Sequence, residues 1–286
     1  MYPIEKLTCK GLMNIVEEES EEYEFVKKGF VKGMGFMGHV TNVMAIHKNN
    51  VSSSLVRQAR LDSFHIFSKA VSIKCGGDAN VKCAWYGGSL DELIEIVSIG
   101  FTGCHIHVED DESHGVGISL FSANFSIDSA MCTVVDENGL RHVMLCKVIL
   151  GNVENVPADS KQSQPSCKKY DTGVDDISAP TKYIIWTAFM NSHIHPDYII
   201  SFNYNNYIKD TFWTIKPGSQ YVMFPNLVAR VSNHLSPSKM CSLLKSYWNY
   251  KEEKIRREIW IKRVRKIVGD DGLLHSVITH GDLQPL

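Results

Sequence analysis

The chain has 286 residues, of which 44% are hydrophobic and 22% charged, and a formal net charge of −2. This length and apolar share are enough for one sizeable core and a second small one. No run of about 18 uncharged apolar residues occurs, so we expect no membrane span. The N-terminus shows no basic segment followed by an apolar stretch, so we expect no secretory signal and an intracellular protein.

The charge is divided unevenly along the chain. Residues 220–286 hold eleven Lys and Arg against six Asp and Glu, a net of +5. Residues 1–219 hold nineteen against twenty-six, a net of −7. Such an asymmetry predicts two modules with different partners.

The eight cysteines are scattered without a Cys-x-x-Cys pair, and in an intracellular compartment we expect reduced thiols. Two clusters could be read as zinc ligands: Cys104, His105 and His107, or His193 and His195. Neighbouring residues point to opposite faces of a strand, and neither cluster has the spacing of a structural zinc site. We therefore predict that no metal is bound.

The first elements are two helices with a strand between them. Residues 17–32 run from acidic to basic, which suits a helix dipole and predicts a short helix. Residues 40–47 are a candidate strand. Residues 52–54 could cap a long helix. The apolar stripe expected on that helix consists of Val56, Ala59, Phe64, Phe67 and Val71.

The middle of the chain combines strands and helices without regular alternation. Residues 81–86 predict a strand, and residues 90–98 predict a helix that ends at Gly100. Asn138-Gly139 signals a turn before a buried strand at residues 141–150. Residues 152–180 predict a long loop, and short strands follow at residues 183–186 and 198–202. The fold class is therefore mixed α+β.

The C-terminal part has a different composition. Lys216-Pro217-Gly218-Ser219 indicates a linker, and Ser236-Pro237-Ser238 starts a helix that runs to about residue 250. Residues 251–268 continue with helical apolar spacing, and a last turn is expected at residues 273–278. We expect a mixed domain over residues 1–213, a linker over 214–219 and a small all-helical module over 220–286.

Two glycine-containing segments resemble the nucleotide site of a known fold. Trp85-Tyr86-Gly87-Gly88-Ser89 and Gly115-Val116-Gly117-Ile118-Ser119 are similar to the ADP-ribosyltransferase domain of poly(ADP-ribose) polymerases (PARPs). In that fold a histidine follows the tryptophan, and a tyrosine follows the Gly-x-Gly-x run. The resemblance places Tyr86 and Ser119 at those positions. It places Lys182 where a glutamate precedes an aromatic-led strand.

Further motifs extend the resemblance to nearly the whole chain. They are residues 58–61 (QARL), 76–82 (GGDANVK), 135–141 (VDENGLR), 173–176 (GVDD) and 190–194 (MNSHI), with Phe224-Pro225 and residues 261–267 (IKRVRKI) in the tail. With them the chain resembles the plant SRO family, named "similar to RCD-one", whose members pair a PARP-like domain with a C-terminal RST module. No WWE domain precedes the PARP-like part, so the chain is similar to the short members of the family.

The resemblance implies an NAD pocket that has lost its chemical groups. In active relatives the histidine hydrogen-bonds the NAD ribose and the tyrosine stacks on nicotinamide. Ser119 lacks that aromatic face, which is worth ~1 kcal/mol beyond area burial. Cleavage of the nicotinamide–ribose bond develops positive charge on the sugar, which a carboxylate stabilises by several kcal/mol. Lys182 reverses the sign of that interaction, so we predict no ADP-ribosyl transfer and no bound cofactor.

Other groups give weaker signals. Asp91, Asp175 and Asp176 could supply a substitute acid, but nothing in their spacing directs them at a sugar, which favours exposed loop carboxylates. Gly115-x-Gly117 alone is a weak phosphate-loop signal, because the next glycine and the strand-to-helix context are missing. The basic residues within 256–266 could bind nucleic acid or direct nuclear import. Interleaved glutamates favour a solvated helix face over nucleic-acid binding, and import stays open.

The C-terminal module either packs on the main domain or leaves an apolar groove for another chain. RST modules resemble docking sites for disordered segments of transcription factors, so the resemblance implies such partners. Basic residues around a groove would suit acidic-hydrophobic segments. We expect most of the apolar residues to be the core of the module itself. The candidate groove residues are Phe224, Leu227, Leu243, Leu244, Tyr247, Trp248, Ile255 and Ile259.

Two functions from different classes follow. The first is a non-catalytic scaffold or co-regulator that binds transcription factors in plant stress and developmental responses. Its expected place is the nucleus, with the cytoplasm as a second compartment, and whether it forms a homo- or heterodimer stays open. The second is a mono-ADP-ribosyltransferase that uses NAD in a rearranged pocket. Lys182 and Ser119 discriminate between them, because the second function needs a substitute carboxylate near the ribose.

Overall fold

The computed structural model describes residues 7–8, 11–103, 114–158, 160–204, 237–251 and 257–268, and the single positions 235 and 255. The chain divides into two compact units, Met1–Asn203 and Tyr204–Leu286. The expected linker at residues 214–219 lies outside the described residues. The domain boundaries at 213 and 219 therefore stay a prediction.

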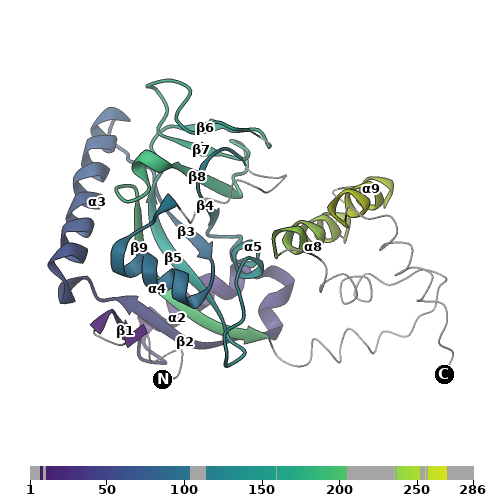
Figure 1. The fold of residues 1–286 in the computed structure, drawn as a ribbon, viewed down its shortest axis with the longest axis horizontal. Coiled ribbons are helices and arrows are strands. Elements are labelled where there is room, and N and C mark those ends of the chain that lie inside the picture. The colour runs from purple at the N-terminus through teal and green to yellow at the C-terminus, as the bar shows by residue number, and fades with distance from the viewer. Residues whose placement is uncertain are drawn as a thin grey trace. The chain divides into compact units, whose positions relative to one another are not determined.

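One nine-stranded sheet runs through the described part of the first unit. Its strands are β1 (Met13–Ile15), β2 (Thr41–Asn49), β3 (Val81–Gly87), β4 (Gly117–Ser122), β5 (Arg141–Ile149), β6 (Val153–Asn155), β7 (Thr172–Val174), β8 (Lys182–Trp186) and β9 (Ile194–Tyr204). Their order is β1-β2-β9-β5-β3-β4-β8-β7-β6 (Figure 1). β3 pairs antiparallel with β5 and β4, and β4 with β8, whereas the edge pair β6–β7 is parallel.

Helices cover both faces of this sheet (Figure 1). They are α2 (Glu21–Gly33), α3 (Leu55–Lys74), α4 (Leu90–Ile99) and α5 (Ser126–Met131). α2 begins at Ser20, whose hydroxyl accepts the Tyr23 amide at 3.1 Å. α4 begins with a capping box in which Ser89 and Glu92 each accept the backbone amide of the other. Gly100, at φ +95°, ends α4 as expected.

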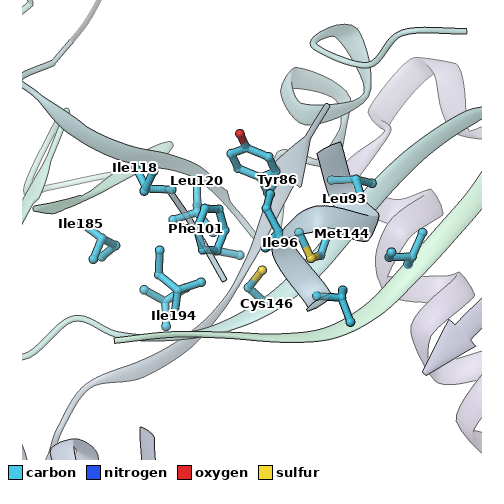
Figure 2. Close-up of a cluster of buried hydrophobic side chains, with 14 of the residues drawn as sticks. Tyr86, Leu93, Ile96, Phe101, Ile118, Leu120, Met144, Cys146, Ile185 and Ile194 are labelled. Carbon is cyan, nitrogen blue, oxygen red and sulfur yellow. The ribbon is translucent and has the colours of Figure 1, made fainter. Parts of the chain in front are cut away.

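The second half of strand β3, Ala84 to Tyr86, is buried on both sides. Tyr86 belongs to a large apolar cluster that includes Leu93 of α4 (Figure 2). The preceding residue, Trp85, points to the other face, where its ring centroid lies 5.4 Å from that of Phe30 in α2. Phe30 also lies 5.0 Å from Phe202 of β9. Because side chains alternate along a strand, each residue of this buried half lies in one of two apolar layers.

Most of the expected elements of this domain are confirmed within a few residues, but the long loop expected at residues 152–180 is interrupted by two strands. β6 and β7 lie inside it, each three residues long. Strands this short have no measurable period, and they depend on pairing at the edge of the sheet. The strand expected at residues 198–202 is also longer, since β9 begins at Ile194.

Strand β9 contains a proline, Pro196. Because proline is unusual inside a strand, the first half of β9 was not predicted from the sequence. The register between β5 and β9 shifts between Leu145 and Cys146, which face Tyr198 and Pro196. Asp197 therefore has no residue opposite it. A bulge of this kind accommodates proline, which cannot donate to the ladder.

The apolar stripe expected on α3 is partly wrong. Phe64 and Val71 are buried, but Val56 is 59% and Phe67 39% exposed. The third buried residue of the helix is Arg57, whose guanidinium donates to the backbone carbonyl groups at positions 11 and 12. α3 thus contacts the domain along a narrow strip and leaves other apolar side chains outside.

The second unit contains α8 (Pro237–Lys251) and α9 (Arg257–Val268). The ring of Trp260 stacks on Tyr250 at 5.1 Å and lies 6.0 Å from Tyr247. The second helix begins later than expected, because the chain bends at Ile255, whose amide bonds the Asn249 carbonyl at 3.2 Å and closes the end of α8. The turn expected at residues 273–278 lies outside the described part. No helix in that part is long and apolar enough to cross a membrane.

Four histidines of the first unit are buried: His47, His142, His193 and His195. Burial lowers the pKa of His47 and that of His193 to about 4. Among the described residues, no group hydrogen-bonds either ring nitrogen of His47. The folded domain therefore holds neutral imidazoles at positions where a charged ring would be costly.

We expect the free energy of unfolding to fall as the pH falls from about 6.5 toward 4. Over that window the unfolded chain binds protons at His47 and His193, whereas the folded chain does not, because both folded pKa values lie below the ordinary 6.5. Each histidine can contribute at most roughly 3 kcal/mol, and neither adds further loss below about pH 4.

Urea unfolding of the full chain at a series of pH values measures this dependence. His47→Leu should make it shallower. His65→Leu, at an exposed position of α3, is the matched control and should leave it unchanged. If the free energy of unfolding depended equally steeply on pH in both variants, His47 would not be a source of the pH dependence.

Candidate functional site

Tyr86, at the position of the expected histidine, points into the core. It is 3% exposed, and its ring meets that of Phe101 edge-on at 5.3 Å. Its hydroxyl donates to Oε1 of Glu92 at 2.5 Å. Burial, followed by the nearby Glu92 carboxylate, raises the pKa of Tyr86 well above its ordinary value, so the phenol stays protonated. The hydroxyl is therefore committed to the first turn of α4.

The two glycines after Tyr86 are in close contact with their surroundings. A Cβ on Gly87 would lie 1.9 Å from the carbonyl oxygen of Ser129 in α5, and a Cβ on Gly88 would lie 2.4 Å from the Glu92 carboxylate. The contact at Gly87 is with backbone and excludes any larger residue, whereas a side chain at Gly88 would displace the end of the Glu92 side chain. Packing thus accounts for both glycines, and α5 covers the chain directly after Tyr86.

Ser119 and Lys182 lie on the neighbouring strands β4 and β8. Ser119 faces Ile184, and Phe121 faces Lys182. Ser119 and Lys182 are therefore diagonal neighbours on one face of the sheet, a separation of roughly 7–8 Å. Both residues are half-buried.

Tyr86 does not share that face. The β4 residues on either side of Ser119, Ile118 and Leu120, belong to the apolar cluster that contains Tyr86 (Figure 2). Ser119, which alternates with them, points to the opposite face together with Lys182. The structure brings two of the three expected positions together and turns the third toward α4.

Among the residues that the structure describes, no carboxylate forms an ion pair with Lys182. Its ammonium group lies 5.6 Å from the ring centroid of Phe121, a cation–π contact. The Lys182 amide donates to Oδ1 of Asp175 at 3.0 Å, and the same oxygen accepts the Thr181 amide at 2.9 Å. None of the ion pairs in the described ranges includes Lys182. A cation thus stands at the position expected for glutamate.

The carboxylates weighed as substitutes have local structural roles. Asp175 holds the turn before β8, and its second oxygen accepts the Thr181 hydroxyl. Asp176 accepts the amide and hydroxyl of Ser178. Asp91 lies in the first turn of α4, where a negative charge suits the helix dipole.

Gly115 and Gly117 serve the packing of β4. A Cβ on Gly115, at φ +90°, would lie 2.8 Å from the Gln162 carbonyl, and one on Gly117 would lie 2.5 Å from the Ile185 carbonyl. The Val116 amide between them donates to Gln162 at 2.7 Å. The run enters a strand rather than a helix, and this amide is already bonded, so it does not form a phosphate loop.

A small cleft lies elsewhere in the domain. Its volume is about 20 Å³, roughly the space of one water molecule. Its lining includes Arg57, Arg60, Asn191 and His195, and it does not include Tyr86, Ser119 or Lys182. The guanidinium of Arg60 donates to the last carbonyl groups of α4. This cleft is therefore separate from the positions that correspond to the NAD pocket.

No group of three or more His, Cys, Asp or Glu in the described residues could hold a metal ion. Cys104, His105 and His107 lie outside those residues. His193 and His195 are both buried, and the pKa of His195 is lowered chiefly by burial.

A buried hydrogen-bond chain of Asp136, His142 and Ser201 escaped the sequence analysis. His142 Nε2 lies 3.0 Å from Asp136 Oδ2, and His142 Nδ1 lies 2.9 Å from the Ser201 hydroxyl. The composition is that of a hydrolase triad, but His142 and Ser201 are 0% exposed, so no substrate reaches them. Asp136 also accepts the amides of Asn138 and Leu140. The motif at residues 135–141 is thus a turn anchored to the core.

Eight residues of the second unit were predicted to line a groove, and the structure describes the side chains of four of them. Leu243 is fully buried, Tyr247 and Ile255 are half-buried, and Ile259 is 44% exposed. Trp260, which contacts two α8 tyrosines, was missed because its neighbour Ile259 fitted the helical spacing. Leu244 and Trp248 belong to α8, and Phe224 and Leu227 lie outside the described residues.

Comparisons with known proteins agree with this geometry. Residues 216–282 match the RCD1-SRO-TAF4 (RST) plant domain. The chain is 37% identical, over 93% of its length and 83% of the relative, to the Arabidopsis thaliana protein named "Probable inactive poly [ADP-ribose] polymerase SRO2". It is 33% identical to "Probable inactive poly [ADP-ribose] polymerase SRO5" of the same plant, over 93% and 84% of the two chains. The crystal structure of the PARP domain of Arabidopsis RADICAL-INDUCED CELL DEATH1 covers 64% of the chain and 98% of that domain, with 35% identity and a TM-score of 0.58.

The nine-stranded sheet and its helices are therefore a PARP-like domain, and an RST region follows it. The chain belongs to the plant SRO family. Both the resemblance found in the sequence and the mixed fold class are confirmed.

The bond between Tyr86 and Glu92 gives a first test of this site. Tyr86→Phe should lower the free energy of unfolding by about 1–3 kcal/mol, because it leaves Oε1 of the part-buried Glu92 carboxylate without its donor. Tyr170→Phe, in a half-buried loop position, is the control and should change stability by less than about 0.5 kcal/mol. Urea unfolding of the full chain, followed by tryptophan fluorescence, measures both. A Tyr86→Phe variant as stable as the control would show that the bond contributes nothing.

Proposed function

We propose that this chain is a non-catalytic interaction protein. Its PARP-like domain transfers no ADP-ribose, and its RST module recruits transcription factors in plant stress and developmental responses. The observation that carries the first part is Lys182, a cation on β8 at the place where active relatives hold a glutamate. The names of SRO2 and SRO5, both probable inactive polymerases, support it.

The charge at position 182 decides against transfer. The sugar becomes positively charged as the nicotinamide bond breaks, so a carboxylate lowers the barrier and an ammonium group raises it. Since Asp175 is held by the backbone before β8, it does not replace the missing glutamate. Among the described residues, no observation favours the alternative, a mono-ADP-ribosyltransferase with a rearranged pocket.

The other two positions weaken NAD binding itself. The Tyr86 hydroxyl already donates to Glu92, so a bound ribose would have to break a charge-assisted hydrogen bond in the core. Ser119 offers no aromatic face to nicotinamide. These two losses support the absence of a bound cofactor.

Restoring the carboxylate alone should not restore transfer. We expect Lys182→Glu, like the unaltered chain, to give neither heat in a calorimetric titration with NAD nor label in an assay with labelled NAD, because Tyr86 and Ser119 remain. An active polymerase in a parallel sample controls for the labelled substrate. Label on the single variant would refute the assignment of the three positions. Heat without label would indicate a nucleotide sensor.

Charge and exposure support the recruitment role of the RST module. Arg263, Arg265 and Lys266 are exposed on α9, and Ile259 of the same helix is 44% exposed. An apolar side chain beside several cations suits a disordered segment that alternates acidic and apolar residues. Transcription regulators that contain such segments act in the nucleus. We therefore place this chain in the nucleus, with the cytoplasm as a second compartment. We keep the module boundaries at residues 214–219 and 220–286 as part of this proposal.

A synthetic peptide of alternating acidic and large apolar residues tests this role. The full chain should bind it, and binding should weaken as salt rises because the charges are exposed. Ile259→Ser should lower the affinity about tenfold, equivalent to roughly 1.4 kcal/mol, and Ile177→Ser, at a 58% exposed position of the first unit, should not. Fluorescence anisotropy measures both. Equal affinities for the two variants would exclude α9 as the docking surface.

A further inference from the structure

Helix α3 carries apolar side chains on the side that faces away from the domain. Leu55 is 89%, Ile66 68% and Ile73 75% exposed, and Val56 and Phe67 flank them. Exposed apolar residues of this size, gathered on one helix, usually mark an interaction surface. The helix lies at the margin of the first unit, as Figure 1 shows.

The exposed side chains follow a regular spacing. Steps of four and three residues connect Leu55, Ala59, Asp62, Ile66, Lys69 and Ile73, and all six are exposed. This is the spacing of the seam of a coiled coil, and we call these six residues the α3 seam. The buried residues Arg57, Phe64 and Val71 lie on the opposite side of the helix. The seam is thus a second face, distinct from the one that packs on the sheet.

We propose that the α3 seam binds the α3 seam of a second copy of this chain, with the two helices antiparallel. In a two-fold arrangement centred near position 64, Leu55 meets Ile73 of the other copy, and Asp62 lies beside Ile66. The long side chain of Lys69 meets the small Ala59. Two large residues, Leu55 and Ile73, therefore pair at each end of the interface. Lys69, the longest side chain of the seam, lies opposite Ala59, the smallest.

Charge complementarity selects the antiparallel copy. Asp62 and Lys69 are seven residues apart in one helix, roughly 10 Å along its axis, so they do not pair within the chain. In the antiparallel dimer each Lys69 lies one turn from Asp62 of the other copy, which forms two ion pairs by symmetry. A parallel pair would place like charges opposite each other. In the described ranges Lys69 has no ion-pair partner. Asp62 accepts a hydrogen bond from the side-chain amide of Gln58.

The apolar and charged parts of the seam have different consequences. Burial of Leu55, Ile66 and Ile73 supplies the attraction, while the two ion pairs define direction and partner. One helix from each copy makes a small interface. A reversible dimer in the micromolar range is therefore expected.

Sedimentation of the full chain over roughly 1–100 µM tests the proposal, since that range brackets a dissociation constant near 10 µM. We expect the unaltered chain to pass from monomer to dimer. Asp62→Lys and Lys69→Asp should each weaken the dimer at least about tenfold, since each replaces two attractions by two repulsions. An equimolar mixture of the two variants should form a heterodimer, because every charge then meets its opposite. The double variant D62K/K69D should dimerise like the unaltered chain.

Two controls keep the test decisive. Lys28→Asp reverses one charge at an exposed position of α2 and should leave the dimer intact. Circular dichroism verifies that each variant is folded. A chain that stays monomeric over the whole range overturns the proposal, and so does a dimer that none of the α3 variants weakens. A mixture of the two single variants that stays monomeric overturns the antiparallel pairing.

Discussion

Burial of the central strands on both faces is the constraint on which the rest of the domain depends. β3 has α4 and its apolar cluster on one side and the Phe30 layer of α2 on the other. The buried residues of the strand, Ala84, Trp85 and Tyr86, must therefore each suit one of two packed layers. Tyr86 satisfies this constraint as a core residue whose single polar group is bonded to Glu92. The same carboxylate caps α4, so one side chain links the strand end, the helix start and the core.

The three positions at which catalytic groups are expected to be replaced serve the packing of this domain. The phenol at position 86 is buried, the glycines after it are in contact with α5 and Glu92, and Lys182 lies over the Phe121 ring. A catalytic site usually holds polar groups in strained or unpaired states at some cost in stability. Where that chemistry is absent, the positions are free to serve the fold. The buried Asp136–His142–Ser201 chain shows the same tendency, since groups able to act as a triad instead anchor a turn.

In the function that we propose, surfaces rather than pockets bind the partners. The exposed cations and Ile259 of α9 form one surface, and the α3 seam forms another. They differ in chemistry, because the first is basic and suits an acidic segment, whereas the second carries one charge of each sign and suits its own copy. A chain with both could present two RST modules at once, which raises the effective concentration of a bound partner.

The sequence alone determined the family, the fold class, and most of the helices and long strands, while its assignment of Tyr86, Ser119 and Lys182 to the three catalytic positions stays a prediction. Those features rest on local periodicity, caps and motif spacing, such as Ser89 with Glu92 before α4. Tertiary structure decided the edge strands β6 and β7, the passage of β9 through Pro196, and which apolar residues of α3 are buried. It also decided that Tyr86 faces α4 while Ser119 and Lys182 share the other face. The reason is physical: register and facing direction depend on pairing between segments distant in sequence, and period alone does not say which face meets a partner.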